Sequence, residues 1–372
     1  MRVLAVLFVC SVQLLTAWGS VGHRIINKNA VLQLPPTMQR FITDSAFLRI
    51  HSTDADTRRT SDTAMFSEQY RHYLDVDEYP DFHNLDRSFD TLVQKFGWMR
   101  VKENGTNPWT TVTVMDSLTK QLKRGDWTAA LQSAADLGHY VGDPHQPLHA
   151  TVNYDGQLTN NKGIHSRYET TMLGRFQGEL VFTKDSLTYV DDVYGYAFSY
   201  ILESNALIDS IFRADSIAKA VSGYTGSGTA PAQYYDTLWK YTSRITRQQI
   251  RLASARLASL WYTAWVNAGL IAGPQSVQRL PGGIPAEFEL YQNHPNPFNP
   301  STTIGFAVAK QGHVHMEIVT MDGRLITRLI DETLEPGTYS ARWNGSAFAS
   351  GTYLCRVQMG GRTLTKKLLL TK

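Results

Sequence analysis

Cysteine is nearly absent from this sequence. The chain has 372 residues and two cysteines, Cys10 and Cys355. Cys10 lies in an amino-terminal apolar run that we expect to be removed, so Cys355 would have no partner for an intrachain disulfide. Cysteine therefore cannot be the main metal ligand, and stability has to come from a hydrophobic core and bound metal.

Long apolar runs are missing after the amino terminus. Arg2 is followed by an apolar run from Val3 to Leu15 and then by Thr16-Ala17, which is the pattern of a secretory signal peptide over residues 1–17. No later run approaches the roughly 18 apolar residues that a membrane span needs. We therefore expect an exported protein whose mature chain is soluble or attached to a surface.

A strong excess of charge is lacking as well. Residues 18–282 carry 26 Lys and Arg against 26 Asp and Glu, and residues 283–372 carry 9 against 7. The first of these parts is formally neutral, so net charge gives no support for a polyanionic substrate.

The spacing of hydrophobic residues changes along the chain. Spacings of three and four predict helices up to about residue 271, most clearly over 113–123, 128–139, 194–217 and 235–268. Alternation predicts strands over 302–308, 314–320, 324–330, 337–343 and 352–359. Gly and Pro gather in residues 271–285, which predicts a linker. We expect an all-α catalytic domain over 18–270 and a small all-β sandwich over 286–372.

Histidines and one aspartate cluster between His139 and His149. His139 and Asp143 are four residues apart, so on a helix they share a face. Pro144 and Pro147 then turn the chain, which allows His149 to approach from another direction. This arrangement predicts a metal site; the alternative is a helix end with a capping aspartate and scattered histidines.

Other candidate ligands flank this stretch. Asp56 and His72 precede it, and His165 and Glu169 follow it with a spacing that suits one helical face. Cleavage after Ala17 would make Trp18 the amino terminus, with an amine and a carbonyl oxygen that could bind metal near His23. Taken singly, each has a structural interpretation: Asp56 could cap a helix and pair with Arg59, and Glu169 could be solvated.

Together these residues resemble the superfamily of zinc-dependent phospholipase C and the S1/P1 nucleases, over Trp18 to about Gly269. The resemblance implies an all-helical domain and three zinc ions, with ligands shared among three sets. These sets are Asp56, His72, His139 and Asp143; His149, His165 and Glu169; and Trp18, His23 and Asp143.

The implied reaction is hydrolysis of a phosphodiester. Two close zinc ions lower the pKa of a shared water to about 7 or below, and a third neutralises a phosphate oxygen and the leaving alkoxide. The resemblance makes Asp56 the catalytic residue that orients or deprotonates the nucleophile. His145 has no matched role and is expected in a loop or beside the ligands.

The substrate is left open between two classes. The five-residue spacing from Trp18 to His23 is the nuclease spacing, whereas Glu169 in place of Asp is the phospholipase choice. Tyr70, Tyr73, Trp98, Trp109 and Tyr168 could stack on a base or line a choline pocket, although each could equally be a core aromatic. We favour single-stranded nucleic acid, with phospholipid head groups as the alternative. A catalytically silent, zinc-stabilised surface protein is a more distant one.

The carboxy-terminal part has its own resemblance. It begins with Asn293-His-Pro-Asn-Pro-Phe-Asn-Pro-Ser-Thr-Thr-Ile304, carries Asp322-Gly-Arg324, and ends in Lys366-Lys-Leu-Leu-Leu-Thr-Lys372. These motifs are similar to the immunoglobulin-like sorting modules of the type IX secretion system. The resemblance implies handling by that machinery, a place at the cell surface or outside, and solvated roles for His294, His313 and His315. We expect no stable protein partner.

Overall fold

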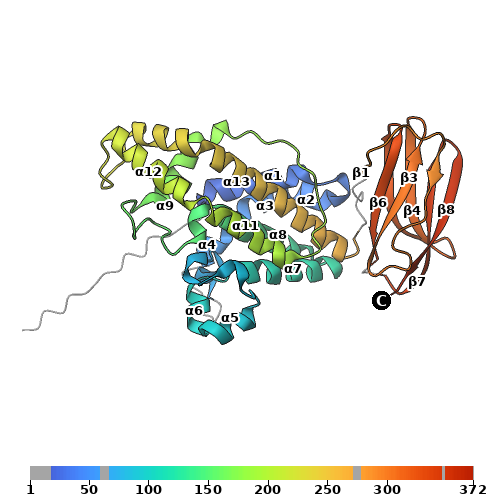
Figure 1. Cartoon of the computed structure of the whole chain (residues 1–372), viewed down its shortest axis with the longest axis horizontal. Helices are drawn as coiled ribbons and strands as arrows, with labels where there is room; N and C mark the ends of the chain where they lie inside the picture. Colours follow the sequence, from blue (N-terminus) through green and yellow to red (C-terminus); the bar gives the residue numbers. More distant parts are fainter. Residues whose placement is uncertain (1–17, 59–66, 271–277, 346–347, 372) are drawn as a thin grey trace, which may run out of the picture.

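Figure 1 shows the computed structural model of the chain, which describes residues 18–58, 67–270, 278–345 and 348–371. A body of helices is followed by two β-sheets. The predicted signal peptide lies outside the described residues. Within those ranges, no helix combines the length and the apolar character that a membrane crossing requires.

Thirteen α-helices are described in the amino-terminal part. They are α1 (Gly19–Gln33), α2 (Gln39–Thr43), α3 (Ser45–His51), α4 (Asp54–Arg58), α5 (Phe89–Phe96), α6 (Trp98–Glu103), α7 (Asn107–Lys123), α8 (Trp127–Gly142), α9 (Ile164–Ser166), α10 (Leu173–Phe176), α11 (Val193–Asn205), α12 (Ile208–Ser222) and α13 (Ala232–Asn267).

Local sequence explains where several helices begin. The Asp126 side chain accepts a hydrogen bond from the Ala129 amide at the start of α8, and Asp192 does the same for Gly195 at the start of α11. These caps satisfy amides that have no partner inside the helix. The long helix α13 packs against α1, α7, α8 and α12, and its fully buried Trp261 donates to the Ala134 carbonyl of α8. The helix that carries His139 is therefore held against the long helix α13.

The predicted helices are present, with one correction. The segment predicted as one helix over 194–217 is two helices, α11 and α12, separated at Ala206 and Leu207. The Leu207 amide donates to the Ser204 carbonyl in a tight turn at this junction. Both halves have the same apolar spacing, so the periodicity did not reveal the break.

The carboxy-terminal part is a sandwich of two four-stranded antiparallel sheets. One sheet has the order β1-β6-β3-β2 and the other β5-β4-β7-β8. The strands are β1 (Gln278–Arg279), β2 (Glu289–Leu290), β3 (Ser301–Val308), β4 (Gly312–Thr320), β5 (Leu325–Leu334), β6 (Gly337–Asn344), β7 (Gly351–Met359) and β8 (Arg362–Leu370). Alternate side chains of both sheets face inward and surround Trp343, which is fully buried.

Three strands lie where the sequence predicted none: the short β2, which pairs with β3, and also β1 and β8. β1 pairs with β6 and falls within the range predicted as a linker, so the sheet already includes Gln278. β8 pairs with β7 along its whole length, although its Lys366-Lys367 pair does not suggest a strand. An edge strand tolerates lysines on its solvent face, which is why its polar character did not exclude pairing.

The sandwich adjoins one end of the helical body (Figure 1). Arg342 of β6 forms an ion pair with Asp191 at 3.2 Å, and both side chains are about half exposed. A hollow of about 710 Å³ lies nearby, between Pro35, Pro36 and Leu270 on one side and β5 on the other. An exposed ion pair contributes at most about 1 kcal/mol, so this contact alone joins the two parts weakly.

Candidate metal centre

The predicted ligands converge where α8 ends. His139 lies in the last turn of α8, and Asp143 begins a short 3-10 turn, Asp143–His145, with Pro144 as its second residue. A second 3-10 turn, Pro147–Ala150, carries His149. The prolines thus redirect the chain as predicted, and His139, Asp143 and His149 are all buried.

Backbone carbonyls orient three of the imidazoles. His139 Nδ1 lies 2.8 Å from the Ser52 carbonyl oxygen and His149 Nδ1 lies 2.8 Å from that of His72. His165 Nδ1 lies 3.1 Å from the Tyr154 carbonyl oxygen. A carbonyl accepts only, so each Nδ1 carries a hydrogen, and the neutral form of each ring presents the lone pair of Nε2 to the site.

Asp143 is the centre of the first group. Its Oδ2 lies 2.9 Å from His72 Nδ1 and 3.3 Å from His139 Nε2. Its other oxygen, Oδ1, lies 3.2 Å from His23 Nε2. One carboxylate thus faces imidazoles of two predicted sets, which is the geometry that a bridging ligand requires.

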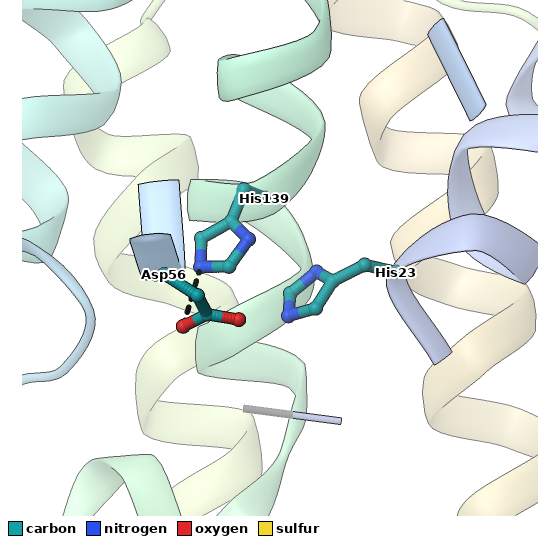
Figure 2. A group of neighbouring side chains, drawn as sticks. All are labelled: His23, Asp56 and His139. Carbon is teal, nitrogen blue, oxygen red and sulfur yellow. Dashed lines mark ion pairs between the residues drawn. The ribbon is translucent and has the colours of Figure 1, made fainter. Parts of the chain in front are cut away.

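Asp56 approaches the same group from α4. Its Oδ1 lies 3.7 Å from His139 Nε2 and 3.9 Å from His72 Nδ1. Figure 2 shows Asp56, His139 and His23 pointing toward one another from three different helices. Their nearest ligand atoms lie within 4.8 Å of one another. His23 is therefore close to Asp56 and His139 as well as to Asp143, a contact that the predicted grouping did not contain.

The second group lies beside the first. His165 Nε2 is 3.0 Å from Glu169 Oε2 and 3.2 Å from His149 Nε2. Glu169 sits in a π-helical segment, Arg167–Met172, that continues from α9. His165 and Glu169 lie on one face of this segment, as their spacing predicted, because their side chains meet at 3.0 Å. All three residues are buried.

Opposite charges compensate for burial in the first group. Burial alone would raise the pKa of Asp143, but His139, His23 and His72 outweigh it and hold that pKa well below its usual value. Burial lowers the pKa of His139, yet Asp143 and Asp56 outweigh burial and raise it to about 9. For His23, burial and the neighbouring His139 lower the pKa.

The second group shows the same compensation. Burial raises the pKa of Glu169, but His165 and His149 outweigh it and lower it to about 2. Glu169 is therefore an anion at neutral pH, and an anion is the form that binds a cation.

The donor atoms of both groups fit zinc. Imidazole nitrogen and carboxylate oxygen are typical zinc ligands at about 2 Å, and three donors within 4.8 Å of one another can surround one ion. Within the described ranges, His23 Nε2 and Asp143 Oδ1 are buried and lie 3.2 Å apart, yet neither has a hydrogen-bond partner. A buried imidazole nitrogen without a partner is costly unless something binds it, which supports a cation here.

Trp18 lies next to His23 at the start of α1. Its ring is buried and contacts that of Tyr168, with centroids 5.8 Å apart. Its carbonyl oxygen accepts a hydrogen bond from the Gly22 amide at 2.9 Å. A Cβ at Gly22 would lie 2.5 Å from the Trp18 Cβ, so only glycine allows this close packing. The predicted cleavage before Trp18, which would free its amine, involves residues outside the described part.

His145 is buried without entering either group. Its Nδ1 donates to the Val141 carbonyl at 2.7 Å, and its Nε2 lies 3.0 Å from Nη1 of Arg256. Burial and then Arg256 lower its pKa to about 3. His145 is therefore a neutral imidazole that supports the turn after Asp143, in line with its lack of a predicted ligand role.

A cavity of about 330 Å³ opens beside the predicted ligands His72, His149 and His165. Its walls include Tyr70, Tyr73 and Tyr154. Asp75 also lines this cavity, and its side chain is buried, with 8% of the residue exposed. No hydrogen-bond or ion-pair partner of the Asp75 carboxylate is found among the described residues. Burial, followed by Asp77 and Glu78, raises its pKa to about 8.

Of the predicted aromatic candidates, only Tyr70 and Tyr73 line this cavity. Tyr168 is fully buried, and Trp109 packs in the core around Phe198. Trp98 contacts Phe89 edge to face. Sequence reasoning missed Tyr154 and Asp75 as cavity residues; their nearness in sequence to His165 and His72 was the available signal.

Models of two known protein families match the two parts of this chain. The S1/P1 nuclease family model matches residues 18–264, and the model of a secretion system C-terminal sorting domain matches residues 292–371. Nuclease S1 of Aspergillus oryzae is 24% identical over 176 residues, 43% of this chain and 56% of the relative. A probable serine protease of Bradyrhizobium tropiciagri is 26% identical over 192 residues, 44% of this chain and 24% of the relative. The chain thus spans less than two thirds of either curated relative.

Two solved structures are also similar over most of the chain. The alpha-toxin of an avian strain of Clostridium perfringens has a TM-score of 0.42 and 12% identity, covering 94% of each chain. The alpha-toxin of Clostridium absonum has the same score and identity, covering 93% of this chain and 94% of its own.

Proposed function

The chain belongs to the S1/P1 nuclease family, and we propose that it is a hydrolase of the phosphodiesterase type that uses three zinc ions to cleave single-stranded nucleic acid. The carboxy-terminal sorting domain marks the protein for export to the cell surface or outside. The observation that carries the proposal is the buried convergence of imidazoles and carboxylates around Asp143 and Glu169.

The proposed ligands follow the two groups and their shared aspartate. One ion would be held by Asp56, His72, His139 and Asp143, and a second by His149, His165 and Glu169. A third would be held by His23, Asp143 and the amino terminus at Trp18. Zinc ions so held lower the pKa of a shared water to near neutrality and neutralise charge on the phosphoryl group.

The chain's own residues would prepare this chemistry. The backbone carbonyls of Ser52, His72 and Tyr154 hold three imidazoles in the tautomer that binds metal. Asp56 lies at the edge of the first group, with Oδ1 further from the imidazoles than the Asp143 oxygens are. We assign Asp56 the role of orienting the attacking water and accepting its proton, because it retains reach toward the site while it holds metal.

The cavity beside the ligands supports a nucleic acid substrate. Tyr70, Tyr73 and Tyr154 supply aromatic surfaces on which an unpaired base can stack. Burial, Asp77 and Glu78 raise the pKa of Asp75 to about 8, and in its protonated form the carboxyl group can both donate and accept a hydrogen bond. A nucleobase edge offers complementary donors and acceptors.

Phospholipid is the second candidate substrate. Aromatic rings with a carboxylate also suit the quaternary ammonium of a choline head group. That cation has no N–H to donate and is best bound by a charged carboxylate, whereas burial, Asp77 and Glu78 raise the pKa of Asp75 and favour its neutral form. For this reason we place nucleic acid first.

The test offers the purified mature protein single-stranded DNA, RNA and phosphatidylcholine vesicles, with and without chelator. We expect cleavage of nucleic acid that stops when zinc is removed. An Asp75→Asn variant should alter base preference, whereas Asp116→Asn, a change at an exposed position on α7, should not. Cleavage of lipid alone would overturn the proposed substrate, and fewer than two zinc ions per mature chain would overturn the trinuclear site.

A further inference from the structure

Gln146 joins the two short turns that carry the proposed ligands. Its amide donates to the Asp143 carbonyl at 2.9 Å, and its carbonyl accepts from the His149 amide at 2.9 Å. The residue therefore lies between a ligand of the first group and a ligand of the second. Its side chain is fully buried, and a buried glutamine normally has hydrogen-bond partners.

The orientation of the Gln146 amide is fixed by the turn. Its Oε1 accepts a hydrogen bond from the Leu148 amide at 2.7 Å. A backbone N–H is always a donor, so the oxygen has to face Leu148, and the NH₂ group has to face the other way. There it donates to Glu169 Oε2 at 3.0 Å.

Glu169 Oε2 is the oxygen that faces the second group. It also lies 3.0 Å from His165 Nε2 and 3.7 Å from His149 Nε2. An imidazole nitrogen that binds zinc carries no hydrogen, so neither histidine could donate to Glu169 while it holds metal. Among the described residues, the Gln146 amide is the donor whose hydrogen bond to this oxygen remains with or without metal.

From this arrangement we infer that Gln146 is a positioning residue, which holds the Glu169 carboxylate in place for the second zinc ion. The inference rests on the proposed zinc site. A hydrogen-bonded partner behind a ligand typically affects metal affinity 10–100-fold when it is removed. The side chain itself would touch neither metal nor substrate.

Gln146→Asn separates this contact from the turn. An asparagine can still accept a hydrogen bond from the amide two residues on, as asparagine commonly does in turns. Its side chain is one methylene shorter, so it does not reach Glu169. Gln146→Met, in contrast, removes both hydrogen bonds. The matched control is Gln249→Asn. Gln249 of α13 is also a buried glutamine, 2% exposed, and it donates a hydrogen bond to Ser204 Oγ of α11 at 2.7 Å.

The measurements are zinc affinity by competition with a chelator, the absorption spectrum of the cobalt-substituted protein, and Tm with and without metal. For Gln146→Asn we expect one class of zinc bound 10–100-fold more weakly, an altered cobalt spectrum, and a smaller rise of Tm on zinc addition. Its metal-free Tm should stay close to wild type. Gln146→Met should share these metal effects and also lower the metal-free Tm, because Leu148 loses its acceptor.

A purely structural role would lower Tm equally with and without zinc and leave the affinity unchanged, which is the pattern expected for Gln249→Asn. If Gln146→Asn binds zinc with wild-type affinity and gives the wild-type cobalt spectrum, the inference is wrong. If the wild-type protein itself binds no zinc at His149, His165 and Glu169, the proposed function fails instead, so the two failures are distinguishable.

Discussion

At the scale of single residues, the site depends on buried charges that are stable only because opposite charges lie beside them. Asp143 is fully buried, and its two oxygens face three imidazoles at 2.9–3.3 Å. An isolated carboxylate at this depth would be protonated rather than charged. The surrounding histidines reverse this tendency, which makes Asp143 the residue on which both of its proposed zinc ions depend.

Replacing Asp143 by asparagine should therefore be more damaging than loss of any supporting residue. Asp143→Asn keeps the shape but removes the negative charge shared by two sets of ligands. We expect phosphodiester hydrolysis to fall by more than the roughly 10–100-fold typical of an outer partner, together with loss of bound zinc measured by elemental analysis. Asp116→Asn serves as the control, and full activity with full zinc content in Asp143→Asn would refute the assigned site.

Glu169 leads to a prediction about pH. Its pKa is lowered from 4.5 to about 2 in the folded protein, so the unfolded chain binds a proton more readily. Its contribution to stability is present above pH 4.5 and is lost as the pH falls toward 2. In chelator, urea unfolding of the wild type should lose stability over this window, and Glu169→Gln should lack that part of the loss. Identical pH profiles for the two proteins would contradict this account.

At the scale of elements, a buried ionic network ties α12 to the segment that carries His165 and Glu169. Asp215 of α12 is fully buried and pairs with Arg167 at 3.0 Å and Lys219 at 2.8 Å. It also accepts a hydrogen bond from Asn161 at 2.8 Å. Arg167 begins the π-helical segment, and Asn161 precedes α9. The network thus fixes both ends of the chain around His165.

Asp215→Asn should destabilise the helical part strongly. The substitution leaves the buried Arg167 guanidinium without its carboxylate, and breaking a buried pair from one side costs about 3–5 kcal/mol. Urea unfolding in the presence of chelator measures this effect without a contribution from zinc. The exposed Asp209→Asn, also on α12, should change the free energy of unfolding by less than about 0.5 kcal/mol. A loss below 1 kcal/mol in Asp215→Asn would show that the network is not essential.

At the scale of the whole molecule, the metal centre and the sorting domain belong to separate cores. The ligands and the cavity beside them are built from the helical part, and the sandwich surrounds its own cluster around Trp343. The ion pair between Arg342 and Asp191 is half exposed. Little in these contacts would transmit metal binding from one core to the other.

Calorimetry of the full chain should therefore show two transitions with different responses to zinc. Ligands that bind only the folded state stabilise it by mass action, about 2.7 kcal/mol at a hundredfold excess over Kd. Chelator should lower the Tm of the helical part by several degrees and leave that of the sandwich unchanged. A single transition, or an equal shift of both, would show that the two parts unfold as one unit.

The sequence alone predicted the secondary structure, the candidate ligands and the residues around them to different extents. Periodicity separated helices from strands, but it merged α11 with α12 and omitted the edge strands β1, β2 and β8, because an apolar repeat does not record a tight turn and an edge strand can be short or polar. The candidate ligands were predicted from residue type and spacing together with the resemblance to the phospholipase C and S1/P1 nuclease superfamily, and the structure brings them close together. Gln146 and Asp75 were not assigned roles, since a buried amide and a cavity carboxyl have no spacing signature.

The sequence by itself determined the chemistry that is possible: imidazoles and carboxylates in a chain with one cysteine beyond its amino-terminal apolar run, and two regions of different period. Only the tertiary structure decided which atoms meet. It placed His23 beside Asp56 and His139, aimed the Gln146 amide at Glu169, and opened a cavity lined by Tyr70, Tyr73, Tyr154 and Asp75. The reason is physical: spacing fixes which residues share a face, whereas contacts between distant segments depend on how whole helices pack.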